Sequence, residues 1–231
     1  MQDYTIGENY TLPSLGKVYE VEVNPEIKLR SMTTEEELKR VGAADNPYKN
    51  MCEIMDDCMI DKPGISAYDM CIGDYQFLLH KLRVVTYGPD YEVSTTCPFC
   101  GCTTTESINL DDLQVLQYTE EFEKYREFDL PKSGKHIRLR VQTPRMLDEV
   151  TAAVKEYRKK TKGLGSDPTL VYIMMHLIEA IDGKMPNPLK IEDWIRHLPM
   201  ADTNLIIQYA EKMNDSIGIL TDLQSNVMFV V

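Results

Sequence analysis

Residues 91–110 read YEVSTTCPFCGCTTTESINL, and this stretch decides the fold that the sequence predicts. Two runs rich in Thr, Val and Ile flank the pentapeptide CPFCG at 97–101. Alternating β-branched residues on both sides of a glycine-containing turn are typical of a β-hairpin. Pro98 restricts φ at the start of the turn, and Gly101 allows a positive φ at its end. The sequence therefore predicts a hairpin whose tip has the form of a zinc knuckle.

The hairpin tip contains the candidate metal ligands. Two cysteines separated by two residues can bind one tetrahedral zinc ion at Zn–S distances of about 2.3 Å. Cys97 and Cys100 fit this spacing, but they supply only half of the ligands that a structural zinc site needs. Two alternatives stay open: a zinc site completed by other residues, or a metal-free turn with buried thiols. The further candidate ligands are Cys102, Cys71, Cys58 and His80.

Composition and charge limit the class of protein. The 231 residues are 43% hydrophobic and 27% charged, which is ordinary for a globular protein with one large or two small domains. A formal net charge of −12 argues against a surface that binds nucleic-acid phosphates, so the expected partners are proteins. No apolar run is long enough to span a membrane, and residues 1–10 lack a secretory signal pattern, so we expect a cytosolic protein. Without export, six cysteines indicate metal ligands or buried thiols rather than disulfides.

The N-terminal third predicts an arm, a hairpin and helices. Residues 1–14 resemble an extended arm, and KVYEVEVNPEIKLRSM at 17–32 alternates apolar and polar residues around Asn24-Pro25, which predicts a hairpin. Its expected apolar face consists of Val18, Val21 or Val23, Ile27 and Leu29. Helices are predicted from Thr33 or Thr34 to about 41, from Pro47 to about 59, and over 75–88 with Asp74 as the N-cap.

The C-terminal half predicts a strand followed by helices. KHIRLRVQT at 135–143 alternates cleanly and predicts a strand, and Pro144 begins a helix. The basic cluster at 155–162 near the end of that helix is interpreted as compensation of the helix dipole rather than a nucleic-acid site. The nearly uniform apolar run at 169–183 predicts one buried helix. Further helices are predicted at 191–198 and after Asp202 as an N-cap, followed by a strand-like segment that includes 221–231.

These features together predict an α+β protein in three parts. Residues 1–32 form the N-terminal arm and β-hairpin, and residues 33–118 form small helices with the zinc-knuckle-like hairpin. Residues 119–231 form a strand followed by a mostly α-helical C-terminal domain.

The sequence predicts no enzyme. It contains no phosphate-binding loop, dinucleotide fingerprint, H-E-x-x-H or G-x-S-x-G motif. A C-x-x-C pair can be redox-active, but such pairs usually begin a helix in a βαβ unit, and here Thr-rich runs flank it. A thiol oxidoreductase is therefore a minor alternative, which would require a depressed pKa of the Cys97 thiol.

The order of motifs between residues 12 and 118 points to a family. The motifs are LPSLGKVY, IKLRSMTTEEE, ISAYDMCIGD, FLLHKLRVVTYGPDYEV, TCPFCG and INLDDLQV. In this order the chain resembles the T-even-type phage baseplate hub proteins, a family that includes hub subunits and hub assembly chaperones. The segment LRVVTYGPDY followed by CPFCG is the specific part of the resemblance. Many members of that family have a second C-P-x-C-G near the C-terminus, which residues up to Val231 lack, so we expect either a lost second knuckle or a chain that continues further.

The resemblance implies a non-enzymatic structural or assembly component of a contractile phage tail baseplate hub. Such a protein would bind other hub, tail-tube or tape-measure proteins, or further copies of itself, and neither nucleic acid nor membrane. It would act in the host cytoplasm during assembly or remain in the virion tail. The alternative is a zinc-ribbon regulatory module that binds nucleic acid or polymerase, which would need a basic face. Acidic residues surround the hairpin instead: Glu92, Glu106, Asp111 and Asp112.

Overall fold

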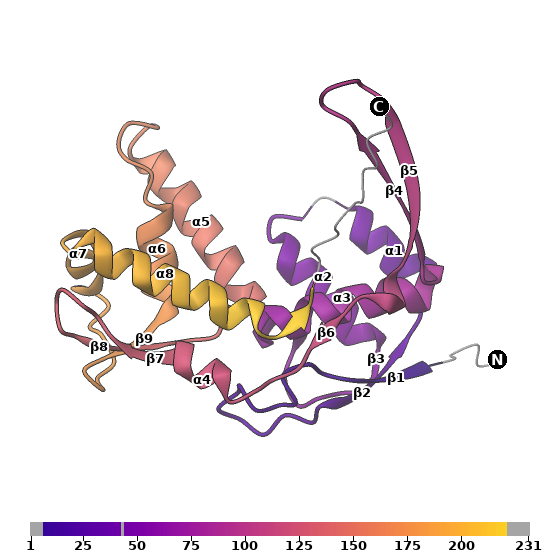
Figure 1. Ribbon diagram of the computed structural model, residues 1–231, viewed down its shortest axis with the longest axis horizontal. Helices are drawn as coiled ribbons and strands as arrows, with labels where there is room; N and C mark the ends of the chain where they lie inside the picture. Colours follow the sequence, from indigo (N-terminus) through magenta and orange to yellow (C-terminus); the bar gives the residue numbers. More distant parts are fainter. Residues whose placement is uncertain (1–6, 43, 221–231) are drawn as a thin grey trace.

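The computed structural model describes residues 7–42 and 44–220, which form a mixed fold of helices and small antiparallel sheets (Figure 1). In the N-terminal part, helices pack against a three-stranded sheet ordered β1-β2-β3. The three helices predicted there are confirmed. The elements are β1 (Gly7–Thr11), β2 (Glu26–Arg30), α1 (Thr34–Val41), α2 (Pro47–Cys58), β3 (Met59–Asp61), the 3-10 turn η1 (Ala67–Asp69) and α3 (Ile72–Tyr87).

After α3 the chain forms a two-stranded ribbon and then the C-terminal part. The ribbon consists of β4 (Asp90–Thr96) and β5 (Thr103–Asn109), as the sequence predicted. The C-terminal part combines helices with a three-stranded sheet ordered β7-β8-β9. No helix in the described ranges is long and apolar enough to cross a membrane. The remaining elements are η2 (Leu110–Asp112), β6 (Val115–Leu116), α4 (Glu121–Arg126), β7 (Glu127–Asp129), β8 (His136–Leu139), α5 (Pro144–Lys160), α6 (Thr169–Leu177), β9 (Ile178–Ile181), α7 (Ile191–Arg196), α8 (Met200–Asp215) and β10 (Gly218–Ile219).

The predicted hairpin at 17–32 is wrong. Strand β2 pairs with β1, from Thr11 opposite Glu26 to Gly7 opposite Arg30, and residues 12–25 form a long loop. The loop buries some apolar side chains, but Val21 is 57% exposed. The alternation at 17–32 therefore combined a loop with a strand, because apolar residues that reach the core from an irregular loop can mimic a period of two.

The predicted single helix at 169–183 is also wrong in its second half. Helix α6 ends at Leu177, and the chain continues as β9, in which Ile178 pairs with Leu139 and Ile181 with Ile137 of β8. A short apolar run suits a buried helix or a buried strand equally well. The neighbouring strand β8, which offers unpaired backbone groups, decides between them here.

Two hydrophobic clusters form the interior, and segments from each end of the chain cross between them. Val18 and Cys71 pack in the cluster that is otherwise formed after residue 119. Ile219 packs in the N-terminal cluster, and Tyr19 contacts both. The three predicted parts therefore share their cores rather than each burying its own.

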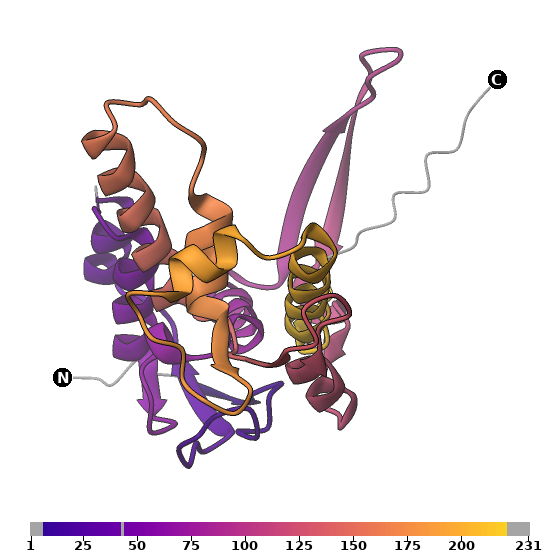
Figure 2. The same cartoon turned by 90° about the vertical axis from the view of Figure 1, so that its left-hand side faces the viewer.

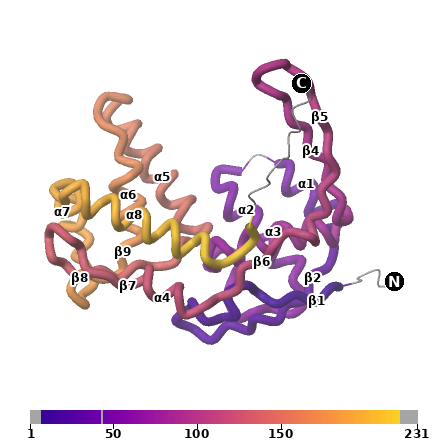
Figure 3. The backbone as a smooth tube through the Cα atoms, in the orientation of Figure 1, coloured from indigo at the N-terminus to yellow at the C-terminus, as the bar shows by residue number. Residues whose placement is uncertain are grey.

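The end of α8 returns to the N-terminal part. Figure 3 shows it next to β6, where β10 pairs with β6. There the backbones of α3 and β10 touch: a Cβ on Gly73 would lie 2.3 Å from the carbonyl oxygen of Ile217. A Cβ on Gly218, which has a φ of +118°, would lie 2.9 Å from the Cα of Gly73. Two glycines thus allow two parts of the chain 145 residues apart in sequence to meet at backbone distance.

Asp74, the predicted N-cap of α3, has a different role. Helix α3 begins earlier, after Cys71, and the Asp74 carboxylate is fully buried. It accepts hydrogen bonds from the Ser14 backbone N–H (2.9 Å), the Ser14 hydroxyl (2.5 Å) and the Tyr19 hydroxyl (2.6 Å). Burial raises the pKa of Asp74, although these hydrogen bonds oppose the shift. Asp74 therefore fixes the loop of residues 12–25 onto α3.

Helix α5 is attached to the N-terminal part by two acidic residues. The Asp148 carboxylate accepts hydrogen bonds from the Lys49 backbone N–H (2.9 Å) and the Tyr68 hydroxyl (3.1 Å). The Arg145 guanidinium forms a bidentate ion pair with Asp69 at 2.6 and 2.8 Å. Bidentate pairing fixes orientation as well as distance, so these contacts set how α5 lies against α2 and η1.

Asp202, the second predicted N-cap, also binds a distant segment instead of capping its own helix. Helix α8 starts at Met200, and the carboxylate of Asp202 accepts hydrogen bonds from the backbone N–H groups of Lys132 (2.9 Å) and Ser133 (2.8 Å). These donors lie in the turn between β7 and β8. Burial alone would raise the pKa of Asp202, but the two backbone donors outweigh it and lower the pKa.

We expect Asp202→Ala to reduce the free energy of unfolding by about 1–3 kcal/mol, because two backbone N–H groups lose their acceptor. A carboxyl with a lowered folded pKa stabilises above its unfolded pKa, and this stabilisation is lost as the pH falls. The difference between the natural protein and the variant should therefore shrink below about pH 4. Urea unfolding at pH 7 and at pH 3.5 measures this difference in stability. An equal difference at the two pH values would contradict the role of the Asp202 carboxylate as the acceptor.

Candidate functional site on the projecting ribbon

The ribbon of β4 and β5 extends away from the rest of the molecule (Figure 2). Its seven residue pairs run from Asp90 opposite Asn109 to Thr96 opposite Thr103. Within the strands only Val93 and Ile108 are partly covered, and every other residue is exposed. Among the described residues neither outer edge pairs with another strand. The ribbon thus presents two faces and two edges to solvent.

Hydrogen bonds between side chains on the two strands and a closed turn explain why this stretch forms a ribbon although neither hydrophobic cluster of the described residues packs against it. The hydroxyls of Ser94 and Thr105 lie 2.9 Å apart across the strands, and those of Thr96 and Thr103 lie 3.2 Å apart. Such cross-strand pairs stabilise a sheet by about 0.2–1 kcal/mol each. At the tip, the Cys97 N–H donates to the carbonyl of Cys102 (2.9 Å), which closes the turn.

The turn has the backbone form that the sequence predicted. The N–H of Gly101 donates to the carbonyl of Cys97 (3.0 Å), and Gly101 has a φ of +72°, a region that glycine adopts without strain. The hairpin and its glycine turn are therefore confirmed.

The base of the ribbon is attached firmly to α3. Arg83 donates hydrogen bonds to the carbonyls of Gly88 and Asp90, and its guanidinium lies 5.4 Å from the centre of the Tyr91 ring. Directly after the other strand, Asp111 of η2 forms an ion pair with Lys81 at 2.6 Å. These contacts hold the direction of the ribbon while its outer half remains free.

The outer half of the ribbon differs chemically from the rest of the chain. Residues 93–105 include no charged side chain, although 27% of the whole sequence is charged. Phe99 at the tip is 92% exposed. Exposed strand edges usually contain lysine or other charges that prevent pairing with other chains, and the outer half of this ribbon lacks that protection. The absence of charge over 93–105 is visible in the sequence and marks this surface, whereas the spacing of the cysteines indicates only the turn.

The tip also brings together three of the six cysteines. Cys97 is half-buried, and Cys100 and Cys102 are exposed. The backbone N–H and the thiol of Cys102, and then the thiol of Cys97, lower the pKa of Cys100. The alternative reading of a knuckle with buried thiols is therefore wrong for Cys100 and Cys102.

The other suggested ligands lie elsewhere. Cys58 and Cys71 are buried in the two separate clusters, and burial raises the pKa of both thiols. The Nδ1 atom of His80 hydrogen-bonds the Gln76 carbonyl of its own helix at 2.8 Å. Within the described ranges, no group of three or more Cys, His, Asp or Glu side chains is arranged to hold a metal ion. The structure therefore does not bring Cys58, Cys71 and His80 together with Cys97 and Cys100.

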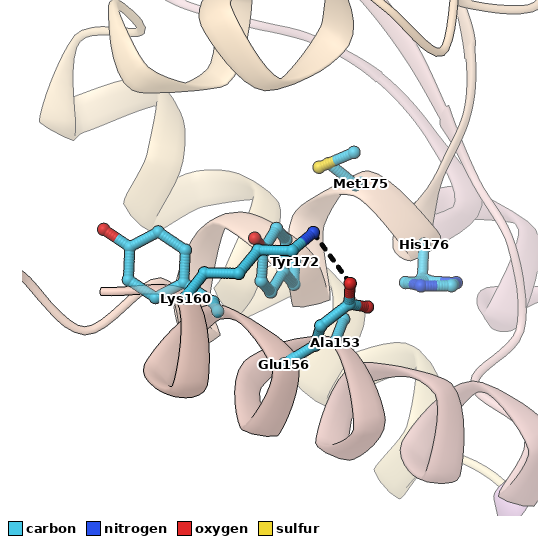
Figure 4. A pocket seen from close by; sticks show the side chains of 7 residues that line it. Ala153, Glu156, Lys160, Tyr172, Met175 and His176 are labelled. Atoms are coloured by element: carbon cyan, nitrogen blue, oxygen red, sulfur yellow. Dashed lines mark ion pairs between the residues drawn. The ribbon is translucent and has the colours of Figure 1, made fainter. Parts of the chain in front are cut away.

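Helices α5 and α6 form a second surface with two shallow hollows. Figure 4 shows the first, of about 230 Å³, where Glu156 and Lys160 form an ion pair at 2.7 Å between Tyr172 and His176. Burial lowers the pKa of His176, with Glu149 opposing the shift, which favours the neutral imidazole at pH 7. The ion pair spans one turn of an exposed helix, an arrangement that stabilises little.

The second hollow, of about 590 Å³, lies along the basic end of α5. Its lining includes two apolar residues, Val150 and Val154, and three basic residues, Lys155, Arg158 and Lys159. Arg158 pairs with Asp167 at 3.0 Å. These cations lie in the last turns of α5, where positive charge stabilises the helix dipole, as the sequence analysis interpreted them.

Comparison with known proteins gives a family for this chain. No curated protein and no solved structure matches it. A family model described as T4 bacteriophage base plate protein matches residues 5–221, nearly the whole chain and much more than the segment 12–118 that had suggested a resemblance. The match includes the ribbon, α5 and α8. The chain therefore belongs to the T4 bacteriophage base plate protein family.

Proposed function

We propose that this protein is a structural or assembly component of the hub of a contractile phage tail baseplate, and that its ribbon is the arm that contacts other proteins. Membership of the base plate family supports a role in the tail baseplate. The observation that supports the arm is the uncharged, exposed outer half of a ribbon whose base is held by Arg83 and Lys81. The role requires no catalysis.

The ribbon suits pairing with a strand of another protein. Each free edge offers backbone N–H and C=O groups that can continue a sheet, which is how many proteins recognise extended segments. The firm base lowers the conformational entropy lost on binding, because the ribbon already points in one direction. Phe99 at the tip supplies an aromatic side chain of the kind that is enriched where partners bind tightly.

The proposed partners are other hub, tail-tube or tape-measure proteins. They would meet this protein in the host cytoplasm during assembly, and a structural subunit would then stay in the virion tail. The zinc-ribbon alternative, which would bind nucleic acid, gains no support from the ribbon, since residues 93–105 include no Lys or Arg to contact phosphates.

We expect Phe99→Asp to lower the yield of infectious phage at least tenfold, because a charge enters an uncharged contact surface. The assay is complementation of a phage deleted for the gene, with tails counted by electron microscopy. Leu189→Asp is the matched control, since Leu189 is also 92% exposed but lies in the loop before α7. Both variants should unfold at the temperature of the natural protein.

The two outcomes separate clearly. Normal tails with Phe99→Asp would show that the ribbon tip is not the contact surface. Normal tails from a phage that lacks the whole gene would contradict the baseplate role itself. Mass spectrometry of purified virions then distinguishes a structural subunit, which is present, from an assembly chaperone, which is absent.

A further inference from the structure

The ribbon tip presents a metal site that one copy of the chain does not complete. A structural zinc ion takes four tetrahedral protein ligands. The knuckle places Cys97 and Cys100 on one closed turn with Cys102 directly after it, and the remaining candidate ligands, Cys58, Cys71 and His80, lie in other elements. All four histidines and all six cysteines are within the described ranges. Residues 7–42 and 44–220 of one copy therefore do not form a complete zinc site.

We propose that a zinc ion joins two copies of this protein at their ribbon tips, each copy supplying Cys97 and Cys100. The site would have four thiolate ligands, two from each copy. Binding releases the four thiol protons to solvent, because a cysteine binds zinc as the thiolate. Zinc is not oxidised or reduced, so no further reactant is needed.

The position of the tip allows two copies to meet there. The ribbon extends beyond the helices of its own chain in both views, and none of the helices and strands that the structure describes covers the turn (Figures 1 and 2). Cys100 is exposed, and Phe99 between the two ligands is 92% exposed. Apposition of two tips would bury both Phe99 side chains, and burial of apolar surface stabilises the contact.

Electrostatics also favours the tip over the rest of the surface. Each copy has a formal net charge of −12, so two copies repel one another over most orientations. The charges nearest the tip in each strand are Glu92 and Glu106. Glu92 is four residues from Thr96, about 13 Å along the strand, which exceeds the screening length of about 8 Å at physiological salt. The uncharged tip is therefore a place where two acidic molecules can approach closely.

Cys102 provides the competing arrangement. A zinc ion bound by Cys97, Cys100 and Cys102 of one copy, with water as the fourth ligand, would leave the protein monomeric. The N–H of Cys97 donates to the carbonyl of Cys102, so Cys102 lies opposite Cys97 at the base of the turn, whereas Cys97 and Cys100 have the C-x-x-C spacing of a zinc knuckle. The two arrangements differ in stoichiometry: one zinc ion per two chains against one per chain.

The test uses the full chain, stripped of metal and kept reduced so that disulfides do not form. Zn²⁺ is added while light scattering after gel filtration measures the mass. We expect the mass to double from 26.5 kDa, with half a zinc ion bound per chain. Co²⁺ in place of Zn²⁺ should give the absorption of a tetrahedral four-thiolate site, a readout independent of mass.

Cysteine variants locate the ligands. Cys97→Ser and Cys100→Ser should each abolish zinc binding and the dimer, whereas Cys102→Ser should keep both. Circular dichroism verifies folding, which the exposed tip should not affect. A monomer with one zinc ion per chain, a dimer that Cys97→Ser leaves intact, or no zinc binding would each overturn the proposal. None of these results would affect the baseplate role, which the phage complementation assay tests separately.

Discussion

Replacing Asp74 by alanine lowers the free energy of unfolding by about 3–5 kcal/mol, because two buried donors and one partly buried donor lose their acceptor at once. The donors are the Ser14 N–H, the Ser14 hydroxyl and the Tyr19 hydroxyl. Ser14 is fully buried, so water does not replace the lost acceptor without opening the loop of residues 12–25. At this chain length the loss corresponds to a fall in Tm of about 10 °C.

Thermal and urea unfolding of matched variants measure this effect. Asp57→Ala is the control, since the Asp57 side chain is half exposed and pairs with Lys39 at 3.4 Å, so its loss should change stability by less than about 0.5 kcal/mol. Asp74→Asn should cost only about 1 kcal/mol, because the amide keeps an acceptor oxygen in the same place. Equal stability of the Asp74→Ala variant and the natural protein would contradict the role of this network.

The pH dependence at Asp74 has the opposite sign to that at Asp202. Burial raises the pKa of Asp74 above its usual value, so its contribution to stability is full below about pH 4 and is lost as the pH rises through the folded pKa. We therefore expect the free energy of unfolding of the natural protein to fall, relative to that of Asp74→Asn, as the pH is raised above about 4. Urea unfolding of the pair across this range measures the difference.

Gly73→Ala should destabilise the protein by about 2–3 kcal/mol, although alanine normally stabilises a helix by about 1 kcal/mol relative to glycine. The reason for the reversed sign is the backbone contact between Gly73 and the segment that follows α8. The added methyl group would lie 2.3 Å from the Ile217 carbonyl oxygen, so β10 must move away from α3. Movement of β10 would also uncover Ile219, which packs in the N-terminal cluster.

Hydrogen exchange localises this effect. The Leu220 N–H donates to the Gln114 carbonyl at 2.9 Å. The amide hydrogen of Leu220 should exchange faster in the Gly73→Ala variant, whereas the amide hydrogens of β8 should be less affected. Gly42→Ala is the control, because Gly42 is exposed with a φ of −66° and an added Cβ would lie 3.3 Å from the nearest atom, the Lys39 carbonyl oxygen, so that a shift of a few tenths of an ångström relieves the contact. A Gly73→Ala protein more stable than the natural one would show that α3 and β10 are not in close contact.

The elements that local residue patterns predicted correctly are those whose stabilising contacts lie within the element. The ribbon at 91–110 has its Thr pairs and its glycine turn within twenty residues, and α1 has its capping box at Thr33 and Glu36. Helix α5 likewise begins at the Thr143 side chain, which accepts a hydrogen bond from the Met146 N–H. The motifs also indicated the baseplate family, which the match to residues 5–221 confirmed.

The errors share one cause, which is pairing between segments far apart in the chain. Residues 26–30 pair with 7–11 instead of 17–23, and residues 178–181 leave a helix to pair with β8. Asp74 and Asp202 have the sequence context of helix caps, yet each binds donors about 60 to 70 residues away. Propensity and periodicity describe a residue and its neighbours, and they do not specify which distant donor or strand will meet it.

At the hairpin tip, too, the local sequence determines the turn, and the packing of distant segments determines which residues lie near it. The spacing of Cys97 and Cys100, with Pro98 and Gly101, was sufficient to predict a knuckle at the end of a hairpin, because four consecutive φ/ψ pairs build that turn. The separation of the tip from every other cysteine and histidine arose only when the ribbon left α3 and the helices packed elsewhere. Local geometry is encoded over a few residues, whereas the number of ligands that reach one point depends on the packing of the whole chain.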